Sequence, residues 1–298
     1  MPELGVFSTA GLPPERRVEL WEGHNAAALI GLSCHAATPL EATEINVPLG
    51  RIQLARVTGS AHVVERTAEV IRRSPADAVA VYVTLRGQAW FRHRDGTWEL
   101  RPGQVLICDA DQPFGRGFAR GLEELAIKVP RADLAPLRSP VVAAFTPDGD
   151  PYARALARLV GRAARAERGV AADEDTVLDV VATLAGGRDA APTVALRAAA
   201  RCFIEEHLTD PGLGAVRVAA ATGISERHLS RVFAADGTTV PRHILSRRLQ
   251  LAYAMLAQGG TVAEVAARCG FTSAAYFSHA FRERFGLRAG DVRRGARP

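Results

Sequence analysis

The stretch VAAATGISERHLSRVF at residues 218–233 decides the fold of the C-terminal third, because it recurs as VAARCGFTSAAYFSHAF at residues 265–281. Gly223 and Gly270 align at an offset of 47 residues, and Phe233 and Phe281 align at 48. Two short helices joined by a tight turn have this pattern. Glycine adopts the left-handed backbone that such a turn needs. Two aligned copies therefore predict two helix-turn-helix motifs.

The repeat also predicts which side chains form the core of each motif. Ala219 and Ala266 precede the glycines by four residues, where the two helices nearly touch and only a small side chain fits. Ile224 and Phe271, just after the turn, are expected to fill the core. The residues expected to face inward from the second helix of each motif are Leu229, Val232, Phe277 and Ala280.

A longer helix is predicted between the two motifs, over residues 240–257. Thr239 is suited to cap its first turn, Gly259 and Gly260 end it, and Thr261 with Glu264 forms a capping box for the next helix. Its 18 residues correspond to a rod of about 27 Å. Successive major grooves on one face of DNA are about 34 Å apart, so one chain can reach two of them.

The distribution of charge supports a nucleic-acid partner. The formal net charge is +5, but residues 193–298 hold 15 basic and 8 acidic side chains, whereas the preceding residues hold 22 and 24. The positive charge therefore lies entirely in the C-terminal third, which is typical of a polyanion-binding end. Lys128 is the only lysine, and arginine suits bidentate contacts to phosphate and guanine.

The N-terminal part has the pattern of a β-sandwich or barrel. After a stretch with helical potential at residues 15–32, short extended runs alternate with turn residues, including a hairpin signal at Asp95-Gly96. The predicted strands are 51–57, 78–85, 88–94, 97–100, 105–108 and 122–129. Residues 130–151 are predicted to be a connection, and helical spacing of Leu156, Leu159 and Val160 then predicts a helical segment.

These patterns define an α+β fold class with three regions. Residues 1–140 are expected to form a cupin-like barrel or sandwich, residues 141–192 a helical linker, and residues 193–298 an all-α domain. Within the all-α domain, the first motif covers about 214–235 and the second about 262–285. The helical segment at about 152–185 is a candidate dimerisation element.

Several further motifs carry a resemblance to a known family. They are Ile204–Leu208 with Pro211, Arg248–Ala252 and Phe281–Gly286, together with the two copies of the repeat. This third of the chain resembles the DNA-binding domain of the AraC/XylS family of transcription regulators. The resemblance implies a monomeric domain that reads two grooves, and usually a ligand-responsive activator that works with RNA polymerase.

A less specific resemblance covers the strand-rich part. Segments 49–54, 64–67, 85–87, 100–103 and 108–113 resemble the cupin-like effector-binding domain found in part of that family. The resemblance implies a small-molecule effector. Tyr82, Trp90 and Phe91 are predicted to line its pocket, the alternative being that they are ordinary core residues.

Base-reading residues are predicted from their positions in the second helix of each motif. In the first motif they are Arg227, His228, Ser230 and Arg231, and the alternative is that these arginines contact only phosphates. In the second motif they are Ala274, Ala275, Tyr276, Ser278, His279 and Arg282. Two alanines contact thymine methyls without hydrogen bonds, so weaker discrimination is expected there. Arg282 and Arg284 are expected to hold phosphates.

Two enzymatic alternatives receive less support. A metal-dependent cupin enzyme with a DNA-binding tail needs an H-x-H pair with further ligands, but His62 and His93 are isolated. DNA alkyl repair needs a reactive cysteine, whereas Cys34, Cys108, Cys202 and Cys269 stand far apart and are expected to be buried. We therefore expect no catalytic residue, no metal and no cofactor.

The remaining expectations concern location and assembly. The N-terminus lacks the pattern of a secretory signal, and no run of 18 apolar residues occurs, so a cytoplasmic protein without a membrane span is predicted. Its predicted partners are double-stranded DNA, a small-molecule effector, RNA polymerase and a second copy of the chain. The sequence leaves open the effector, the operator, the sign of regulation and the oligomeric state.

Overall fold

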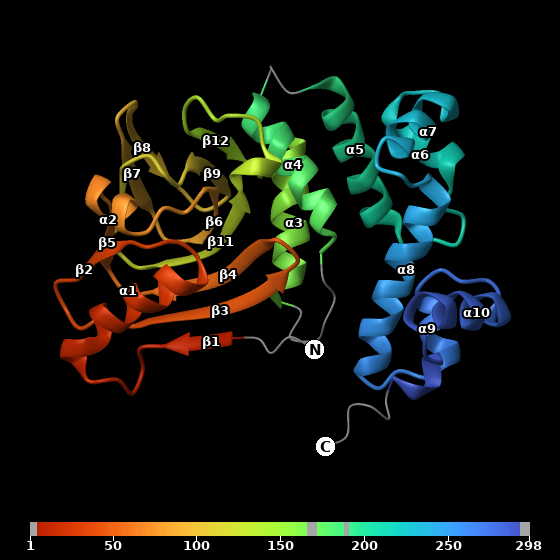
Figure 1. Ribbon diagram of the computed structural model, residues 1–298, viewed down its shortest axis with the longest axis horizontal. Helices are drawn as coiled ribbons and strands as arrows, with labels where there is room; N and C mark the ends of the chain where they lie inside the picture. The colour runs from red at the N-terminus through yellow and green to blue at the C-terminus, as the bar shows by residue number, and fades with distance from the viewer. Residues whose placement is uncertain (1–4, 166–171, 188–190, 293–298) are drawn as a thin grey trace. The chain divides into compact units, whose positions relative to one another are not determined.

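The computed structural model describes residues 5–165, 172–187 and 191–292, which fold into two units (Figure 1). Residues 1–164 with 180–190 make up the N-terminal unit, and residues 165–179 with 191–298 make up the C-terminal unit. The chain of the predicted linker thus divides between the two units. Residues 166–171 and 188–190 of that linker lie outside the described residues.

Two antiparallel sheets form the framework of the N-terminal unit. The larger sheet has the order β1 (Gly5–Ser8), β3 (Ala42–Leu49), β4 (Ile52–Gly59), β11 (Leu122–Pro130), β6 (Ala78–Arg86), β9 (Gln104–Asp109) and β12 (Val141–Ala144). The smaller sheet has the order β2 (Ser33–His35), β5 (His62–Arg66), β10 (Phe114–Phe118), β7 (Ala89–His93) and β8 (Gly96–Leu100). The described strands form no closed barrel, so of the predicted barrel and sandwich the sandwich is correct.

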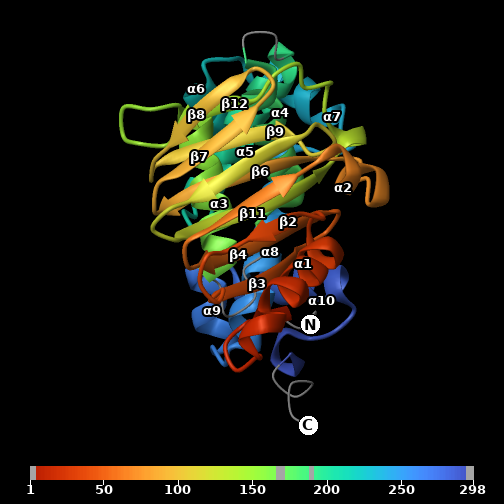
Figure 2. The ribbon, with the colours of Figure 1, turned by 90° about the vertical axis from the view of Figure 1, so that its left-hand side faces the viewer.

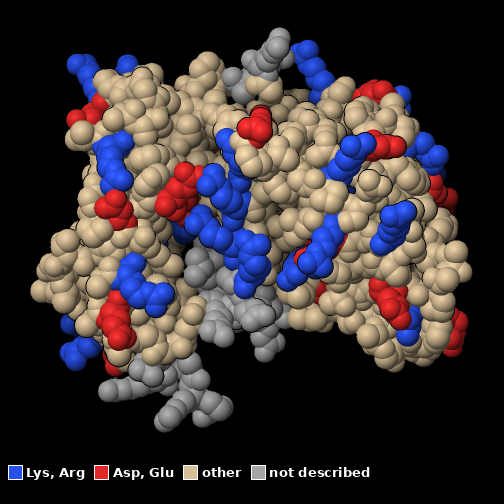
Figure 3. Space-filling model, turned by 180° about the vertical axis from the view of Figure 1, so that it is seen from behind, with Lys and Arg blue, Asp and Glu red and all other residues tan. Residues whose placement is uncertain are grey.

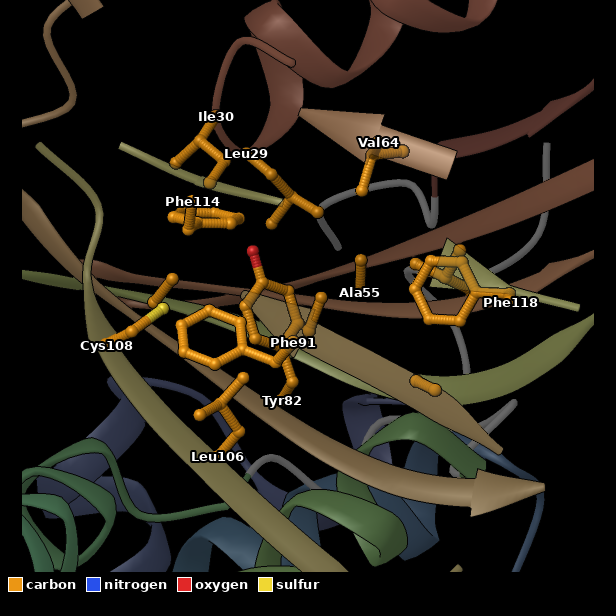
Figure 4. Close-up of a cluster of buried hydrophobic side chains, with 14 of the residues drawn as sticks. Leu29, Ile30, Ala55, Val64, Tyr82, Phe91, Leu106, Cys108, Phe114 and Phe118 are labelled. Carbon is orange, nitrogen blue, oxygen red and sulfur yellow. The ribbon is translucent and has the colours of Figure 1, made fainter. Parts of the chain in front are cut away.

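The core of the N-terminal unit lies between the two sheets. Tyr82 and Leu106 contribute from the larger sheet, Phe91 and Phe114 from the smaller one, and all four are buried in one apolar cluster (Figure 4). Helix α1 (Arg17–Ala28) contacts β2 and adds Trp21 to this cluster, and Figure 2 shows it beside β2. The other face of the larger sheet is also buried, and α3 (Pro151–Arg165) lies on that side (Figures 1 and 2).

All six predicted strands are present, with ends shifted by at most two residues, but the prediction missed several others. The expectation that residues 130–151 only connect was wrong in part, because β12 pairs with β9 inside that segment. Strand β10 has the sequence FGRGF, and glycine disfavours strands. Gly117 is needed there because the Trp90 indole of the neighbouring strand occupies the space of a Cβ. A cross-strand contact therefore explains a strand that propensity did not predict.

Helices α5 (Pro192–His207), α6 (Ala215–Thr222), α7 (Glu226–Ala234), α8 (Val240–Ala257), α9 (Val262–Arg268) and α10 (Ala274–Phe285) form most of the C-terminal unit. They enclose two apolar clusters. The first joins α5, α6 and α7 to the start of α8, including Val240 and Ile244. The second joins α9 and α10 to the rest of α8, including Leu249 and Ala252. The helix between the motifs was predicted with both of its ends correct.

Helix α4 (Glu174–Gly186) lies in the predicted linker, and a short helix α2 (Ala68–Arg73) follows β5. Within the candidate dimerisation segment, Leu156, Leu159 and Val160 are all buried. None of the described helices has both the length and the apolar character needed to span a membrane.

Candidate DNA-binding surface and ligand cavity

The first helix-turn-helix consists of α6 and α7. Gly223 ends α6 in the left-handed conformation, with φ of 70°, and the backbone N–H of Ile224 donates to the carbonyl of Ala219 at 3.1 Å. The hydroxyl of Ser225 then caps α7 by accepting from the backbone N–H of His228. Leu229 and Val232 are buried, as the repeat predicted, and Phe233 is buried beside them.

The second helix-turn-helix repeats this geometry with α9 and α10. Gly270 has φ of 80°, and the backbone N–H of Phe271 donates to the carbonyl of Ala266 at 3.0 Å. The capping box is confirmed, because the hydroxyl of Thr261 donates to the Glu264 carboxylate at 2.7 Å and caps the backbone N–H of Glu264. Phe277 and Ala280 are buried under α10.

Ser273 supports a first prediction, on the stability of the second motif. Its hydroxyl accepts from the backbone N–H of Tyr276 at 3.2 Å, so Ser273→Ala should lower the free energy of unfolding by about 1 kcal/mol. Thermal unfolding followed by far-UV circular dichroism measures this loss. Ser278→Ala is the matched control, because Ser278 is exposed inside the same helix and caps nothing. Equal losses in the two variants would contradict the capping role.

All ten residues predicted to contact DNA are exposed. On α7, Arg227, Ser230 and Arg231 share one face because they are three and four residues apart. The structure records no acidic partner for Arg227 or Arg231 among the residues that it describes. His228 lies at the N-terminal end of the same helix. The first motif therefore presents two free guanidinium groups on an exposed helix face.

Helix α10 presents a less charged face. Ala275, Ser278, His279 and Arg282 follow one another at helical spacing, and Ala274 and Tyr276 lie in the first turn. Tyr276 is 55% exposed, one of the few large apolar side chains of the described chain to be so accessible. His279 lies 4.0 Å from the Glu283 carboxylate, which also faces solvent. The surface of α10 thus offers methyl, hydroxyl and aromatic groups, with Arg282 and Arg284 in its last turn.

Other arginines of the C-terminal unit form ion pairs with carboxylates of the same unit. Arg197 and Arg201 both donate to the carboxylates of Asp179 and Asp236, at distances from 2.6 to 3.0 Å. Arg247 donates to Glu205 at 2.6 Å, with both side chains buried. On the face seen in Figure 3, basic and acidic side chains are accordingly interspersed. Exposed arginines on α7 and α10 supply part of the positive charge of this third of the chain, and three of its other arginines lie outside the described residues.

A cavity of about 40 Å³ lies inside the N-terminal unit. Its walls come from α1, its following loop and both sheets, and include Trp21, Leu29, Ile30, His62, Tyr82, Arg116, Phe118 and Glu124. A cavity of this size has room for about three water molecules. Figure 4 shows the Tyr82 hydroxyl pointing toward the side that carries Leu29 and Ile30.

A buried ion pair forms the polar part of this wall. Arg116 donates from both terminal nitrogens to the two oxygens of Glu124, at 2.9 and 2.6 Å, and its guanidinium lies 3.7 Å from the centre of the Tyr82 ring. Burial acts to lower the pKa of Arg116, but the charge and hydrogen bonds of Glu124 outweigh it and raise the pKa. Burial raises the pKa of Tyr82, so its hydroxyl stays protonated. Burial also lowers the pKa of His62, against the bond between Nδ1 and the Ser60 carbonyl.

The three residues predicted to line a ligand pocket have different positions. Tyr82 lines the cavity. Phe91 is fully buried in the apolar cluster, where it packs against Trp98 and Phe114. Trp90 points to the other side of its strand, under the guanidinium of Arg92 and against Gly117. The alternative interpretation as core applies to Phe91, and no sequence pattern pointed to Arg116 or Glu124.

The groups that the enzymatic alternatives need are not brought together. His62 bonds to Ser60, and His93 lies 3.2 Å from Asp95 in the next turn. Among the described residues, no three His, Cys, Asp or Glu side chains are placed to hold a metal ion. Three of the four free cysteines are buried and Cys202 is half-buried. Burial raises the pKa of Cys34 to about 12 and that of Cys269 to about 11, which disfavours the reactive thiolate.

The fold and the two exposed recognition helices define a DNA-binding protein with a separate sensor-like sandwich. Comparison with known families agrees: an AraC-binding-like domain matches residues 27–187, and a helix-turn-helix domain matches residues 218–295. The chain therefore belongs to the AraC family of transcriptional regulators.

Individual relatives support the same assignment. The transcriptional activator NphR of Rhodococcus sp. is 24% identical over 265 residues, which cover 83% of this chain and 79% of the relative. The transcriptional activator RhrA of Rhizobium meliloti (strain 1021) is 34% identical over 94 residues, 30% of each chain. The crystal structure of the AraC-like transcriptional activator CuxR aligns with a TM-score of 0.51 at 21% identity, and the match covers 87% of this chain and 98% of that one. The fold shared with CuxR therefore includes both the N-terminal and the C-terminal unit of this chain.

Proposed function

We propose that this protein activates transcription by inserting α7 and α10 into two successive major grooves of a promoter. The observation that carries the proposal is the exposure of all ten predicted contact residues, on two helices that each follow a left-handed glycine. Arg227 and Arg231 read guanine through O6 and N7, the commonest specific contact in the major groove. Arg282 and Arg284 hold phosphates, which adds affinity without sequence information.

The two motifs contribute unequally to sequence recognition. Helix α7 offers two arginines on one face, whereas α10 offers Ala275, Ser278 and His279 at the equivalent positions. Alanine contacts a thymine methyl but makes no hydrogen bond. The half-site under α7 is therefore read more strictly than the half-site under α10.

The sandwich of the N-terminal unit is proposed to bind the effector in the cavity beside Tyr82. The Arg116–Glu124 pair is internally neutral, and apolar side chains form most of the wall, so the proposed ligand is a small, largely apolar molecule. A ligand larger than a few heavy atoms enters only when the walls move, since the cavity is about 40 Å³. Such a ligand acts by favouring one conformation of the chain over another.

Further partners follow from this proposal. An activator contacts RNA polymerase at the promoter, in the cytoplasm where the DNA is. A homodimer would place two such DNA-binding domains side by side on the duplex. The helical segment at about 152–185 stays the candidate for its interface, through side chains other than the buried Leu156, Leu159 and Val160.

One experiment tests the function directly. Promoter fragments retained by the protein across a genome are sequenced, and a retained fragment is then used in gel-shift assays at low salt. We expect a limited set of fragments with a shared motif, bound more tightly than random duplex. Failure to retard any duplex at low salt would contradict the proposal. The genes beside the retained promoters then indicate which small molecules to test on the N-terminal unit.

A further inference from the structure

The two apolar clusters of the C-terminal unit meet at the middle of α8. Val240 and Ile244 belong to the cluster of the first motif, and Leu249 and Ala252 belong to the cluster of the second. Arg248 stands at the boundary between the two clusters. A single helix between two small cores can bend or twist, so the position of one recognition helix relative to the other needs a further restraint.

Arg248 provides a bridge at this boundary. Its Nε donates to the Leu208 carbonyl at 2.9 Å, and a terminal nitrogen donates to the Asp210 carbonyl at 2.6 Å. Leu208 follows the last residue of α5, so its carbonyl is one that the helix leaves unpaired. Burial lowers the pKa of Arg248, against the charge of Asp210, but arginine remains charged at any ordinary pH. The planar guanidinium therefore fixes the loop before α6 onto α8.

Gly270 places the second motif against the same loop. A Cβ on Gly270 would lie 2.9 Å from the Thr209 carbonyl oxygen and 3.1 Å from a terminal nitrogen of Arg248. A Cβ on Gly223, its counterpart in the first motif, would meet no atom within 4 Å. Both glycines have positive φ, but only at Gly270 does the backbone of another segment lie too close for a side chain. The turn of the second motif thus packs directly on the loop that Arg248 holds.

Beside this contact the two motifs are not closely packed. A groove of about 200 Å³ lies between them, with Leu213 and Ile244 on one side and Phe271 and Tyr276 on the other. Space of this kind lets two parts move relative to each other. The restraint at this place therefore depends on the contact among Arg248, Gly270 and the 208–210 loop.

We propose that this contact, which we call the interlock, fixes the distance and angle between α7 and α10 and thereby sets one permitted spacing between the two half-sites. The proposal rests on the placement of α7 and α10 in successive major grooves. One added base pair shifts the second half-site by about 3.4 Å and rotates it by about 35° about the DNA axis. A rigid protein cannot follow that change, whereas a protein hinged at α8 can.

The test measures affinity as a function of half-site spacing. An operator is selected from random duplexes with the full-length protein, and copies with one base pair added or removed between the half-sites are compared by gel shift. The wild type should lose at least about tenfold in affinity at either altered spacing, a loss typical of removing one good contact set. In Arg248→Ala and Gly270→Ala, affinity for the original spacing should fall, and the penalty for altered spacing should shrink below about threefold.

Gly223→Ala is the matched control, because it introduces the same left-handed strain without the collision. It should keep the full spacing penalty of the wild type. Arg248→Lys should be intermediate, since a single ammonium lacks the planar fork that reaches both carbonyls. A footprint over the first half-site in every variant shows that the first motif is still folded.

Two results would overturn the interlock. One is a full spacing penalty in both Arg248→Ala and Gly270→Ala, which would show that α8 alone holds the motifs. The other is a wild type that tolerates the altered spacings. Failure of the underlying function has a different signature, because the wild type would then bind no operator at all.

Discussion

Replacing Arg231 with alanine is expected to lower affinity for the preferred operator about 5- to 150-fold while affinity for random duplex changes little. The expectation follows from the position of Arg231, which is exposed on the same face of α7 as Arg227 and has no acidic partner among the described residues. A bidentate contact to guanine contributes about 1–3 kcal/mol of discrimination. The ratio of specific to non-specific dissociation constants at one salt concentration is the quantity to measure.

Arg282→Ala is the comparison that separates the two kinds of contact. Arg282 lies in the last turn of α10, and a phosphate contact there adds affinity for every sequence alike. The variant should weaken binding to operator and random DNA by similar factors, and it should reduce the salt dependence by about one counterion. If Arg231→Ala also lost affinity equally for operator and random DNA, the division into base-contacting and phosphate-contacting residues would be refuted.

The second large effect is expected in the N-terminal unit. Glu124→Ala should lower its free energy of unfolding by about 3–5 kcal/mol, because it leaves the charge of Arg116 buried without a partner. Arg116 and Glu124 are 2% and 4% exposed. All three tryptophans, Trp21, Trp90 and Trp98, belong to this unit. Denaturant unfolding followed by tryptophan fluorescence therefore reports on this unit alone.

Two further variants identify the cause of that loss. Glu123→Ala, one residue earlier on the same strand, removes a carboxylate that pairs with the more exposed Arg56 and Arg86, and should cost about 1 kcal/mol or less. The double variant Arg116→Met with Glu124→Leu should recover most of the stability, since an apolar pair of similar size carries no desolvation cost. A double variant as unstable as Glu124→Ala would mean that lost packing is responsible.

The helix-turn-helix motifs were predictable because their signals are local. The spacing of Leu229, Val232 and Phe233 determines which face of α7 is buried, and the exposed contact residues follow from that face. Glycine at the turn and the serine and threonine caps act within four residues along the chain. The same residue pattern occurs in both copies of the repeat, so the second copy supports the prediction of a helix-turn-helix in the first.

The cavity and the interlock were not predictable, because they depend on how separate strands, helices and loops pack against one another. Alternation along β7 requires that Trp90 and Phe91 face opposite sides, but which of them faces the core depends on the register between strands. Arg116 meets Glu124 across β10 and β11, which the structure assigns to different sheets. Gly270 meets Thr209 across 60 intervening residues of chain. None of these pairs has a local sequence signature.

Methylation interference on the selected operator tests whether a single chain contacts two successive major grooves through α7 and α10. We expect two patches of interference on one face of the duplex, about 10–10.5 base pairs apart. Arg231→Ala should erase only the patch under α7, and a change at Ser278 or His279 should alter only the other. A single patch, or two patches that both respond to Arg231→Ala alone, would contradict the account.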